Sequence, residues 1–411
     1  MRKSIPKAFA VLAIIFVVVV VVVASTTTAA GSGRGLPAAK PGDTGMSAER
    51  LALLDMLMSE ALERKEFPGA VLLVAHKGRT VWRKAYGLSQ WVPDQRPMSA
   101  DMIFDMASVT KPVATATSIM ILAERGRLRL QDKVKDYVPE FAPYLLEGGI
   151  PGEDARLWNL LTHTSGLPPY TDPKEIERLY GDPCPAEVLV KHIAGLRKES
   201  RPGAVFTYSC LNYITLARIV KLVSGKDLAE FAGENIFKPL GMTRTFFIPP
   251  AACLDLCVPT QVYDGKPLRG VVHDPLARIQ GGISGNAGLF ATADDLAVFA
   301  QMMLDGGAFG KVRVLSPLTV ERMIEVFPKA REAGRGLGWD LDSDYASVRG
   351  DLFGLDSFGH SGYTGTSVWI DPETRTTVIF LTNRVHPDDA GSIIAMRSKV
   401  ANVVASSILV K

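Results

Sequence analysis

The alternation of hydrophobic and polar positions changes twice along the chain, from strands to helices and back to strands. Near the beginning, Ser47 is an N-cap candidate for a helix that ends close to Arg64 and carries apolar residues along one face. Residues 70–75 are apolar and branched, a lysine–glycine turn follows, and residues 80–86 return. This pattern predicts a helix followed by a β-hairpin.

Helical spacing of apolar residues dominates the middle of the chain, from about residue 114 to about residue 330. Loops rich in glycine and proline separate the predicted helices. The clearest helical stretches are 186–196, 212–223, 227–237 and 293–304. We therefore expect a lobe built mainly of helices at 114–330.

Strand patterns return after this helical stretch. The candidates are 336–341, 357–360, 364–370 and 376–382, and residues 390–409 then have the pattern of a closing helix. Because strands lie at both ends of the chain and helices lie between them, the pattern predicts an α+β fold. One antiparallel sheet is built from both chain ends and flanked by the terminal helices, and the helical lobe is inserted into it. A cleft between the two parts is the expected site.

The extreme N-terminus is predicted to be a targeting segment. Three basic residues precede an unbroken apolar run at 8–24, and small residues follow it. The run is longer than the about 7–15 residues of a usual signal sequence and shorter than the about 20 residues of a membrane span. Residues 1–30 are therefore either a cleaved signal peptide or an uncleaved anchor that contacts the membrane. Both alternatives place the rest of the chain outside the cytoplasm.

Composition also sets the domain boundaries and excludes one class of partner. Residues 31–45 contain many small, glycine and proline residues, which predicts a flexible linker. Residues 46–411 then form one domain that holds both the sheet and the helical lobe. The formal net charge is +3, and three basic residues at the extreme N-terminus account for it. A near-neutral body offers no electrostatic surface for nucleic acid.

Four cysteines leave the redox chemistry open: Cys184, Cys210, Cys253 and Cys257. An exported protein can form disulfides, and four cysteines allow three pairings between which the sequence does not choose. Buried, unpaired thiols are the equal alternative. No cysteine or histidine pair has zinc-finger spacing and the HExxH pattern is absent, so neither a metal nor a cofactor is expected.

The segment from Ser108 to Lys111 carries the first candidate chemistry. Ser108 precedes an apolar-periodic stretch, which places it at a helix N-terminus, and Lys111 lies three residues on, on the same face. A serine hydroxyl is a weak nucleophile until a base takes its proton, and a lysine neutralised by burial can be that base. An N-cap serine beside a solvated lysine has the same spacing, so this motif alone decides nothing.

Two later motifs extend the candidate site: Tyr208-Ser209-Cys210 and His360-Ser361-Gly362. Tyr208 lies in a predicted loop, where a phenol near Ser108 could relay protons, although an isolated tyrosine is more often an ordinary packed residue. The histidine motif separates two predicted strands. Extended backbone there could pair with a substrate and donate an N–H group to its carbonyl oxygen.

The three motifs, in this order, resemble the serine β-lactamase and penicillin-binding-protein superfamily, in its class C-like branch. Further strings support the resemblance, which covers about Ser47 to Lys411: Leu-Leu-Thr-His-Thr-Ser-Gly-Leu at 160–167, Pro-Leu-Gly-Met at 239–242 and Gly-Asn-Ala-Gly-Leu-Phe at 285–290. It implies a β-lactamase/transpeptidase-like fold and a serine hydrolase that works through an acyl-enzyme. These strings are specific for the superfamily and not for a substrate.

The resemblance also implies a role for each motif. Ser108 would be acylated, Lys111 would accept its proton, and Tyr208 would shuttle protons to the leaving group and from the hydrolytic water. The backbone N–H groups of Ser108 and Tyr363 would form the oxyanion hole. The remaining motif residues would contact the substrate: Cys210, His360, Ser361 and Gly362.

Two departures from the family pattern bear on the substrate. Cys210 stands where asparagine is usual, and His360 stands where many relatives have lysine, so a permanent cation for a β-lactam carboxylate is missing. We therefore expect an exported hydrolase of an amide or ester, with a small-molecule or peptide partner such as a peptidoglycan fragment or muropeptide. A β-lactamase or D-alanyl carboxypeptidase is one alternative, and a non-catalytic protein that binds wall fragments is another.

Overall fold

The computed structural model describes residues 35–410. The expected signal peptide or anchor at 1–30 lies outside these residues. Within the described part of the chain, no helix combines the length and hydrophobicity that a membrane crossing requires.

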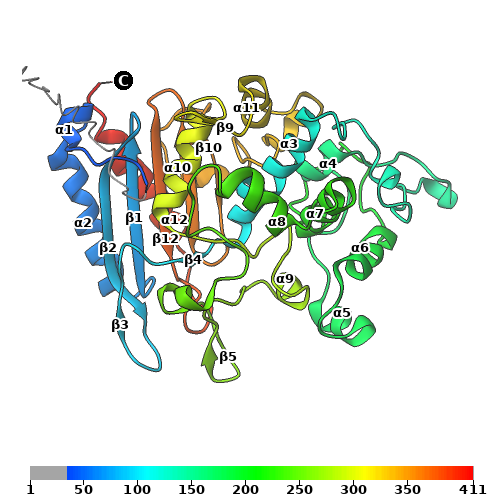
Figure 1. Cartoon of the computed structure of the whole chain (residues 1–411), viewed down its shortest axis with the longest axis horizontal. Coiled ribbons are helices and arrows are strands. Elements are labelled where there is room, and N and C mark those ends of the chain that lie inside the picture. Colours follow the sequence, from blue (N-terminus) through cyan, green and yellow to red (C-terminus); the bar gives the residue numbers. More distant parts are fainter. Residues whose placement is uncertain (1–34, 411) are drawn as a thin grey trace, which may run out of the picture. The chain divides into compact units, whose positions relative to one another are not determined.

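A six-stranded antiparallel sheet is built from both ends of the chain, as the strand patterns predict (Figure 1). Its central pair joins β1 to β12, with Ala70 opposite Thr382 and His76 opposite Thr376. In spatial order the strands are β10 (Phe358–Ser361), β11 (Thr366–Asp371), β12 (Thr376–Thr382), β1 (Gly69–His76), β2 (Arg79–Gln90) and β3 (Arg96–Pro97). The α+β fold is thereby confirmed.

Helices cover both faces of this sheet. On one face, α2 (Ala48–Glu63) and α12 (Ile394–Ser406) pack on Leu72 and its same-face neighbours. On the other face, α10 (Ala293–Leu304) packs on Val71 and its neighbours. Burial on both sides explains why β1 is apolar at nearly every position. The sequence placed residues 293–304 in the helical lobe, but this helix belongs to the sheet, because helical periodicity does not identify the surface that a helix covers.

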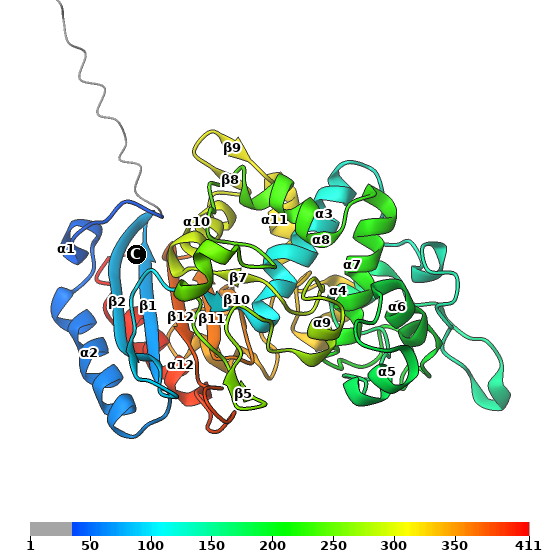
Figure 2. The ribbon, with the colours of Figure 1, turned by 60° about the horizontal axis from the view of Figure 1, so that its bottom comes forward.

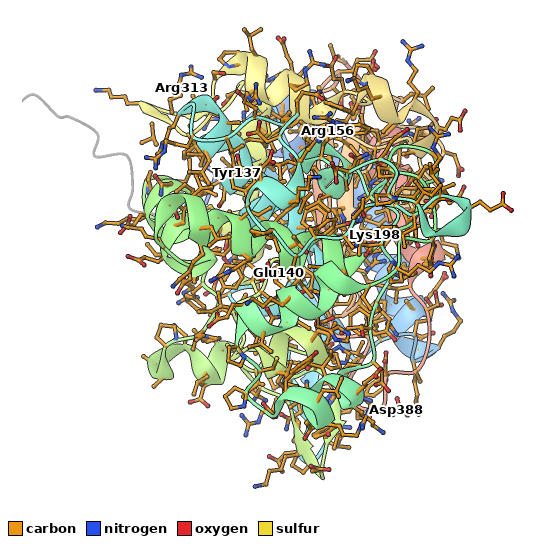
Figure 3. All side chains as sticks on the ribbon, turned by 90° about the vertical axis from the view of Figure 1, so that its right-hand side faces the viewer. Tyr137, Glu140, Arg156, Lys198, Arg313 and Asp388 are labelled. Atoms are coloured by element: carbon orange, nitrogen blue, oxygen red, sulfur yellow. The ribbon has the colours of Figure 1, made fainter. Side chains whose placement is uncertain are left out.

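The remaining helices form the lobe beside the sheet. Its central helix is α7, which packs against α3, α4, α6 and α8. Figure 2 shows α4–α7 gathered away from the strands, and Figure 3 looks onto this lobe. The lobe helices are α3 (Thr117–Glu124), α4 (Leu157–Leu161), α5 (Pro173–Tyr180), α6 (Ala186–Gly195), α7 (Cys210–Ser224), α8 (Leu228–Ala232), α9 (Pro275–Ile279) and α11 (Pro317–Ile324).

Short paired strands link the two parts. They are β4 (Phe104–Asp105) with β7 (Phe290–Ala291), β5 (Val262–Tyr263) with β6 (Lys266–Pro267), and β8 (Ala308–Phe309) with β9 (Val312–Arg313). The first pair leads directly into the segment that holds Ser108.

Two expected segments have a different structure. Residues 336–341 were expected as a strand but form a tight turn, in which the Gly336 N–H donates to the Trp339 carbonyl at 3.0 Å and Gly338 takes a φ of +96°. Only glycine adopts that angle without strain, so the turn breaks the strand pattern. Residues 35–45, expected to be part of a flexible linker, include α1 (Pro41–Thr44), and the Thr80 N–H on β2 donates to the Pro37 carbonyl at 2.9 Å.

Candidate active site

Ser108 lies where the sheet side of the molecule meets the helical lobe. A 3₁₀ turn at Ala107–Val109 carries it, a wide helical turn at Lys111–Ala116 follows, and α3 continues the same helix. Ala107 has a φ of +45°, unusual for a residue with a side chain, and its N–H donates to Asp105 Oδ1 at 2.9 Å. The surrounding contacts thus hold a strained turn that projects the Ser108 hydroxyl. The expectation of a helix N-terminus at Ser108 agrees with this geometry.

Lys111 is fully buried directly behind this serine. Its Nζ donates to Ser108 Oγ at 2.9 Å and to the Asn286 carbonyl at 3.0 Å, and it lies 3.6 Å from Cys210 Sγ. An ammonium has three hydrogens, and these three neighbours use all of them. Two of the neighbours, Cys210 and Asn286, lie 99 and 175 residues from Lys111 in the sequence, so the fold itself fixes the position of the amine.

A glycine makes the Asn286 contact possible. A Cβ atom at Gly285 would lie 1.9 Å from the Tyr213 carbonyl oxygen, which is closer than any real contact. The Thr115 hydroxyl donates to the Gly285 carbonyl at 2.7 Å and anchors the segment against the helix that carries Lys111. Only glycine lets this segment pass between that helix and α7.

Tyr208 lies next to the amine. Lys111 Nζ is 5.0 Å from the centre of the Tyr208 ring, and the His163 ring is 4.4 Å from the same ring. His163 Nδ1 accepts a hydrogen bond from the Ser209 N–H at 3.1 Å, so it also fixes the backbone beside the tyrosine. The three motifs of the sequence do not include His163. In the structure His163 supports Tyr208. The family-like string at residues 160–167, which contains this histidine, was the signal in the sequence.

His360 lies at the end of β10 and is neutral. Its Nδ1 donates to the Ser361 carbonyl at 2.8 Å, and its Nε2 has no hydrogen-bond partner among the described residues. Burial, aided by the charges of Arg335 and Lys111, puts the pKa of His360 well below that of a free histidine. As the sequence predicts, this position supplies no permanent cation.

Gly362 brings the end of β10 against the serine turn. A Cβ atom at this position would lie 2.5 Å from the Met106 carbonyl oxygen and 2.2 Å from Thr366 Oγ1. Arg397 secures the same strand end by donating to the Gly362 and Thr366 carbonyls at 2.8 Å each. Between residues 35 and 410, neither the Ser108 nor the Tyr363 backbone N–H has a hydrogen-bond acceptor. Both groups are therefore free to bind an oxygen anion.

A cavity of about 560 Å³ opens onto these groups. Its lining includes Ser108, Tyr208 and residues 360–363, together with Arg335, Tyr345 and Arg384. Cys210 is not among the lining residues, so its expected contact with the substrate stays a prediction. It begins α7, and its Sγ lies 3.6 Å from Lys111 Nζ.

The charge on Lys111 depends on its neighbours. Burial lowers the pKa of Lys111, but Cys210 and Tyr208 raise it when they are ionised, and the net effect is a pKa above the usual lysine value. Burial raises the pKa of the Cys210 thiol, while the charge of Lys111 acts in the opposite direction. Burial alone does not make Lys111 the neutral base that the sequence suggested, because its neighbours oppose the effect.

The four cysteines are free thiols, and Cys210 is the one that touches a catalytic candidate. The described residues contain no cluster of three or more histidine, cysteine, aspartate or glutamate side chains arranged to hold a metal ion. The groups gathered around Ser108 are therefore the ones whose chemistry needs explanation.

A comparison with known protein families gives this geometry its context. Residues 54–401 match the profile of the family described as Beta-lactamase. The chain belongs to the beta-lactamase family. It is therefore a serine hydrolase of the superfamily that includes the penicillin-binding proteins, as the order of its motifs predicts.

Relatives of this beta-lactamase family member carry other names as well. An Escherichia coli K12 protein named "Putative D-alanyl-D-alanine carboxypeptidase" is 30% identical over 85% of this chain and 86% of its own length. A Salmonella agona protein of the same name is 28% identical over the same shares of both chains.

Solved structures show the same fold. EstCE1, described as a hydrolase with promiscuous acyltransferase activity, is similar with a TM-score of 0.70 and 23% identity, over 87% of this chain and 99% of its own. An octameric penicillin-binding protein homologue from Pyrococcus abyssi has a TM-score of 0.67 and 24% identity, over 87% of this chain and 79% of its own. The likeness establishes the β-lactamase/transpeptidase-like fold.

Proposed function

We propose that this protein is an exported serine hydrolase that forms an acyl-enzyme at Ser108 with an amide or ester substrate. The observation that carries the proposal is the 2.9 Å hydrogen bond between Lys111 Nζ and Ser108 Oγ, made by a fully buried amine at the wall of a cavity. An N-cap serine with a solvated lysine would leave the amine in water, and here it is not. The interpretation of Ser108 as an ordinary N-cap beside a solvated lysine therefore does not fit these contacts.

The proposed reaction uses the same groups of the site in acylation and in deacylation. Ser108 Oγ attacks the substrate carbonyl, its proton passes to the Lys111–Tyr208 pair, and the same pair protonates the leaving group. The backbone N–H groups of Ser108 and Tyr363 bind the oxygen anion of the tetrahedral intermediate. Water then attacks the acyl-enzyme, and the proton it loses returns through the pair to Ser108.

The substrate that we propose is a small ester, or an amide such as a wall-derived peptide or muropeptide. The third motif supports this choice, because neutral His360 offers no permanent charge to a β-lactam carboxylate. Two arginines of the cavity have partners within the protein: Arg384 Nε donates to the Tyr363 carbonyl at 2.9 Å, and Arg335 Nη1 pairs with Asp340 at 3.2 Å. The names of the Escherichia coli and Salmonella relatives favour a second candidate, a D-alanyl carboxypeptidase.

Intact mass spectrometry separates these possibilities. The protein is incubated with a fluorophosphonate, a fluorescent penicillin, a short-chain ester and a muropeptide ending in D-alanyl-D-alanine. We expect a lasting phosphonate adduct on Ser108 and faster turnover of the ester or the muropeptide amide than of the penicillin. Release of the terminal D-alanine as the fastest reaction would select the carboxypeptidase, and rapid penicillin turnover would select a β-lactamase. No adduct at Ser108 from any reagent would contradict the proposal and favour a binding protein.

Export is the remaining part of the proposal. It rests on the basic and apolar character of residues 1–30 in the sequence. Fractionation of expressing cells, followed by sequencing of the mature N-terminus, tests it: a start near residue 25 or 31 indicates cleavage, an intact N-terminus in the membrane fraction indicates an anchor, and an intact cytoplasmic protein contradicts export.

A further inference from the structure

Arg335 carries a buried charge that the mechanism above does not use. Its side chain is 1% exposed and makes one ion pair, from Nη1 to Asp340 Oδ2 at 3.2 Å. Its Nε and Nη2 atoms are buried without a hydrogen-bond partner in the part of the chain that the structure describes. Burying a guanidinium with unsatisfied N–H groups costs stability, so its position needs an explanation other than packing.

The guanidinium lies beside the catalytic tyrosine. Arg335 Cζ is 5.8 Å from the centre of the Tyr208 ring and 5.8 Å from that of Phe206. Lys111 Nζ lies 5.0 Å from the same Tyr208 ring. Two cations, from separate segments of the chain, are therefore within 6 Å of one phenol.

The histidines and phenols around Tyr208 do not change this positive field at neutral pH, whereas the Asp340 carboxylate offsets part of it. Burial holds the pKa values of His163 and His360 well below that of a free histidine, so both rings are neutral. Burial likewise raises the pKa of Tyr213 and Tyr345, so both phenols keep their protons. Among the described residues, the charged and titratable groups that face Tyr208, or act on these neighbours, are Lys111, His163, Cys210, Tyr213, Asp274, Arg335, Asp340, Asp344, Tyr345, His360 and Arg397.

We propose that Arg335 is a positioning residue that acts through Tyr208: its guanidinium stacks near the phenol and favours negative charge on the phenolic oxygen, so that Tyr208 accepts the Ser108 proton. This inference rests on the proposed function and assigns the base within the Lys111–Tyr208 pair. The Arg335 guanidinium is 1% exposed, so its charge is screened less by water than a surface charge would be. Asp340 restrains the effect, since its carboxylate offsets part of the guanidinium charge.

The test measures how fast a fluorophosphonate labels Ser108 as a function of pH, from about pH 5 to about pH 10, a range that spans histidine to tyrosine titration. Arg335→Met removes the charge at similar size, and Asp340→Asn removes the offsetting carboxylate. Arg349→Met is the matched control, because Arg349 pairs with Asp342 at 3.1 Å in the same region and does not line the cavity. Circular dichroism melts verify that each variant is folded.

The two variants are expected to shift the profile in opposite directions. Arg335→Met moves the low-pH side of the rate profile, the acid limb, to higher pH by about one unit. Labelling at a given pH on that limb is then about tenfold slower. Asp340→Asn moves the limb down, and Arg349→Met leaves it in place. A merely structural Arg335 would lower the rate equally at every pH, and that result overturns the proposal.

If Arg335→Met does not fold, the direction of the Asp340→Asn shift decides the question: a shift down supports the proposal, and no shift or a shift up overturns it. Failure of the proposed function is distinguishable, because the wild-type protein would then not be labelled at Ser108 at all.

Discussion

Lys111 and Lys198 are both buried lysines, one at the active site and the other inside the helical lobe. Lys198, labelled in Figure 3, donates to the Ala194 and Leu196 carbonyls at 3.2 and 2.9 Å and lies 4.2 Å from the Phe141 ring. Burial lowers the pKa of Lys198 to about 8. At Lys111 burial acts in the same direction, but Cys210 and Tyr208 reverse the outcome.

The difference teaches that burial alone does not make a lysine catalytic. Lys198 is the amine that loses its proton more readily, yet its hydrogen bonds go to carbonyl groups, which have no proton to give. Lys111 holds its proton more firmly but contacts a serine hydroxyl. Reactivity follows from the partner and from a neighbouring group that can share the proton.

The largest expected effect comes from removing the Ser108 hydroxyl, which accepts a hydrogen bond from Lys111 and has no counterpart at Lys198. Ser108→Ala should eliminate the fluorophosphonate adduct, because the nucleophile is gone, while the thermal melt stays close to that of the wild type. Ser200→Ala is the matched control: Ser200 lies two residues from Lys198, and its hydroxyl is buried without a partner between residues 35 and 410. Full labelling of Ser108→Ala would contradict the assignment of the nucleophile.

The next largest effect is expected when methionine replaces each of the two lysines in turn. Lys111→Met should slow Ser108 labelling by about 10²–10⁴-fold, the usual cost of losing a proton-transfer group. Lys198→Met should leave the labelling rate within about twofold, because Lys198 has no contact with the cavity. Measured second-order rate constants at one pH are sufficient. Equal losses in the two variants would show that both lysines act only through stability.

A smaller effect is expected on stability, and here Lys198 is the sensitive residue. Its folded pKa of about 8 lies below the unfolded value of about 10.4, so the unfolded chain binds the extra proton. The stability of the wild type therefore rises between about pH 8 and about pH 10.4 as this penalty disappears.

Lys198→Met should accordingly raise the free energy of unfolding by about 1–3 kcal/mol at pH 7 and by less above about pH 10. Urea titrations at both pH values measure this difference. A constant effect at both values would mean that packing, and not the proton, sets the stability of this part of the lobe.

The smallest effect concerns the strained turn in front of the catalytic serine. Ala107→Gly should raise the free energy of unfolding by about 0.5–1 kcal/mol, because glycine adopts a positive φ without strain. The labelling rate should fall modestly, since a relaxed turn holds Ser108 less firmly. Urea titration and labelling of the same preparation test both parts. A less stable protein would show that the Ala107 side chain contributes more by packing than its backbone costs.

The sequence predicted the parts of the site that depend on motif order. Ser108, Lys111 and Tyr208 are brought together as expected, and Tyr363 presents the free N–H group that the resemblance implied. The sheet built from both chain ends was also predictable, because the strand patterns at 70–86 and 357–382 are alternating or apolar and bounded by turns.

The remaining features depend on contacts that the local sequence does not specify. Buried arginines are rare, so nothing around Arg335 signalled its position beside Tyr208. The pKa of Lys111 depends on Cys210 and Tyr208, about a hundred residues away in the sequence. The strand expected at 336–341 failed because a left-handed glycine turn overrides apolar patterning.

The pairing of β1 with β12 has a consequence for biosynthesis. Ala70 lies opposite Thr382 in this pair, so the second edge of β1 has no partner until nearly the whole polypeptide has been made. During that interval an apolar strand edge is available to other chains. Folding should therefore be slow and dependent on holding factors, and loss of the last forty residues should yield aggregated material instead of a shorter enzyme.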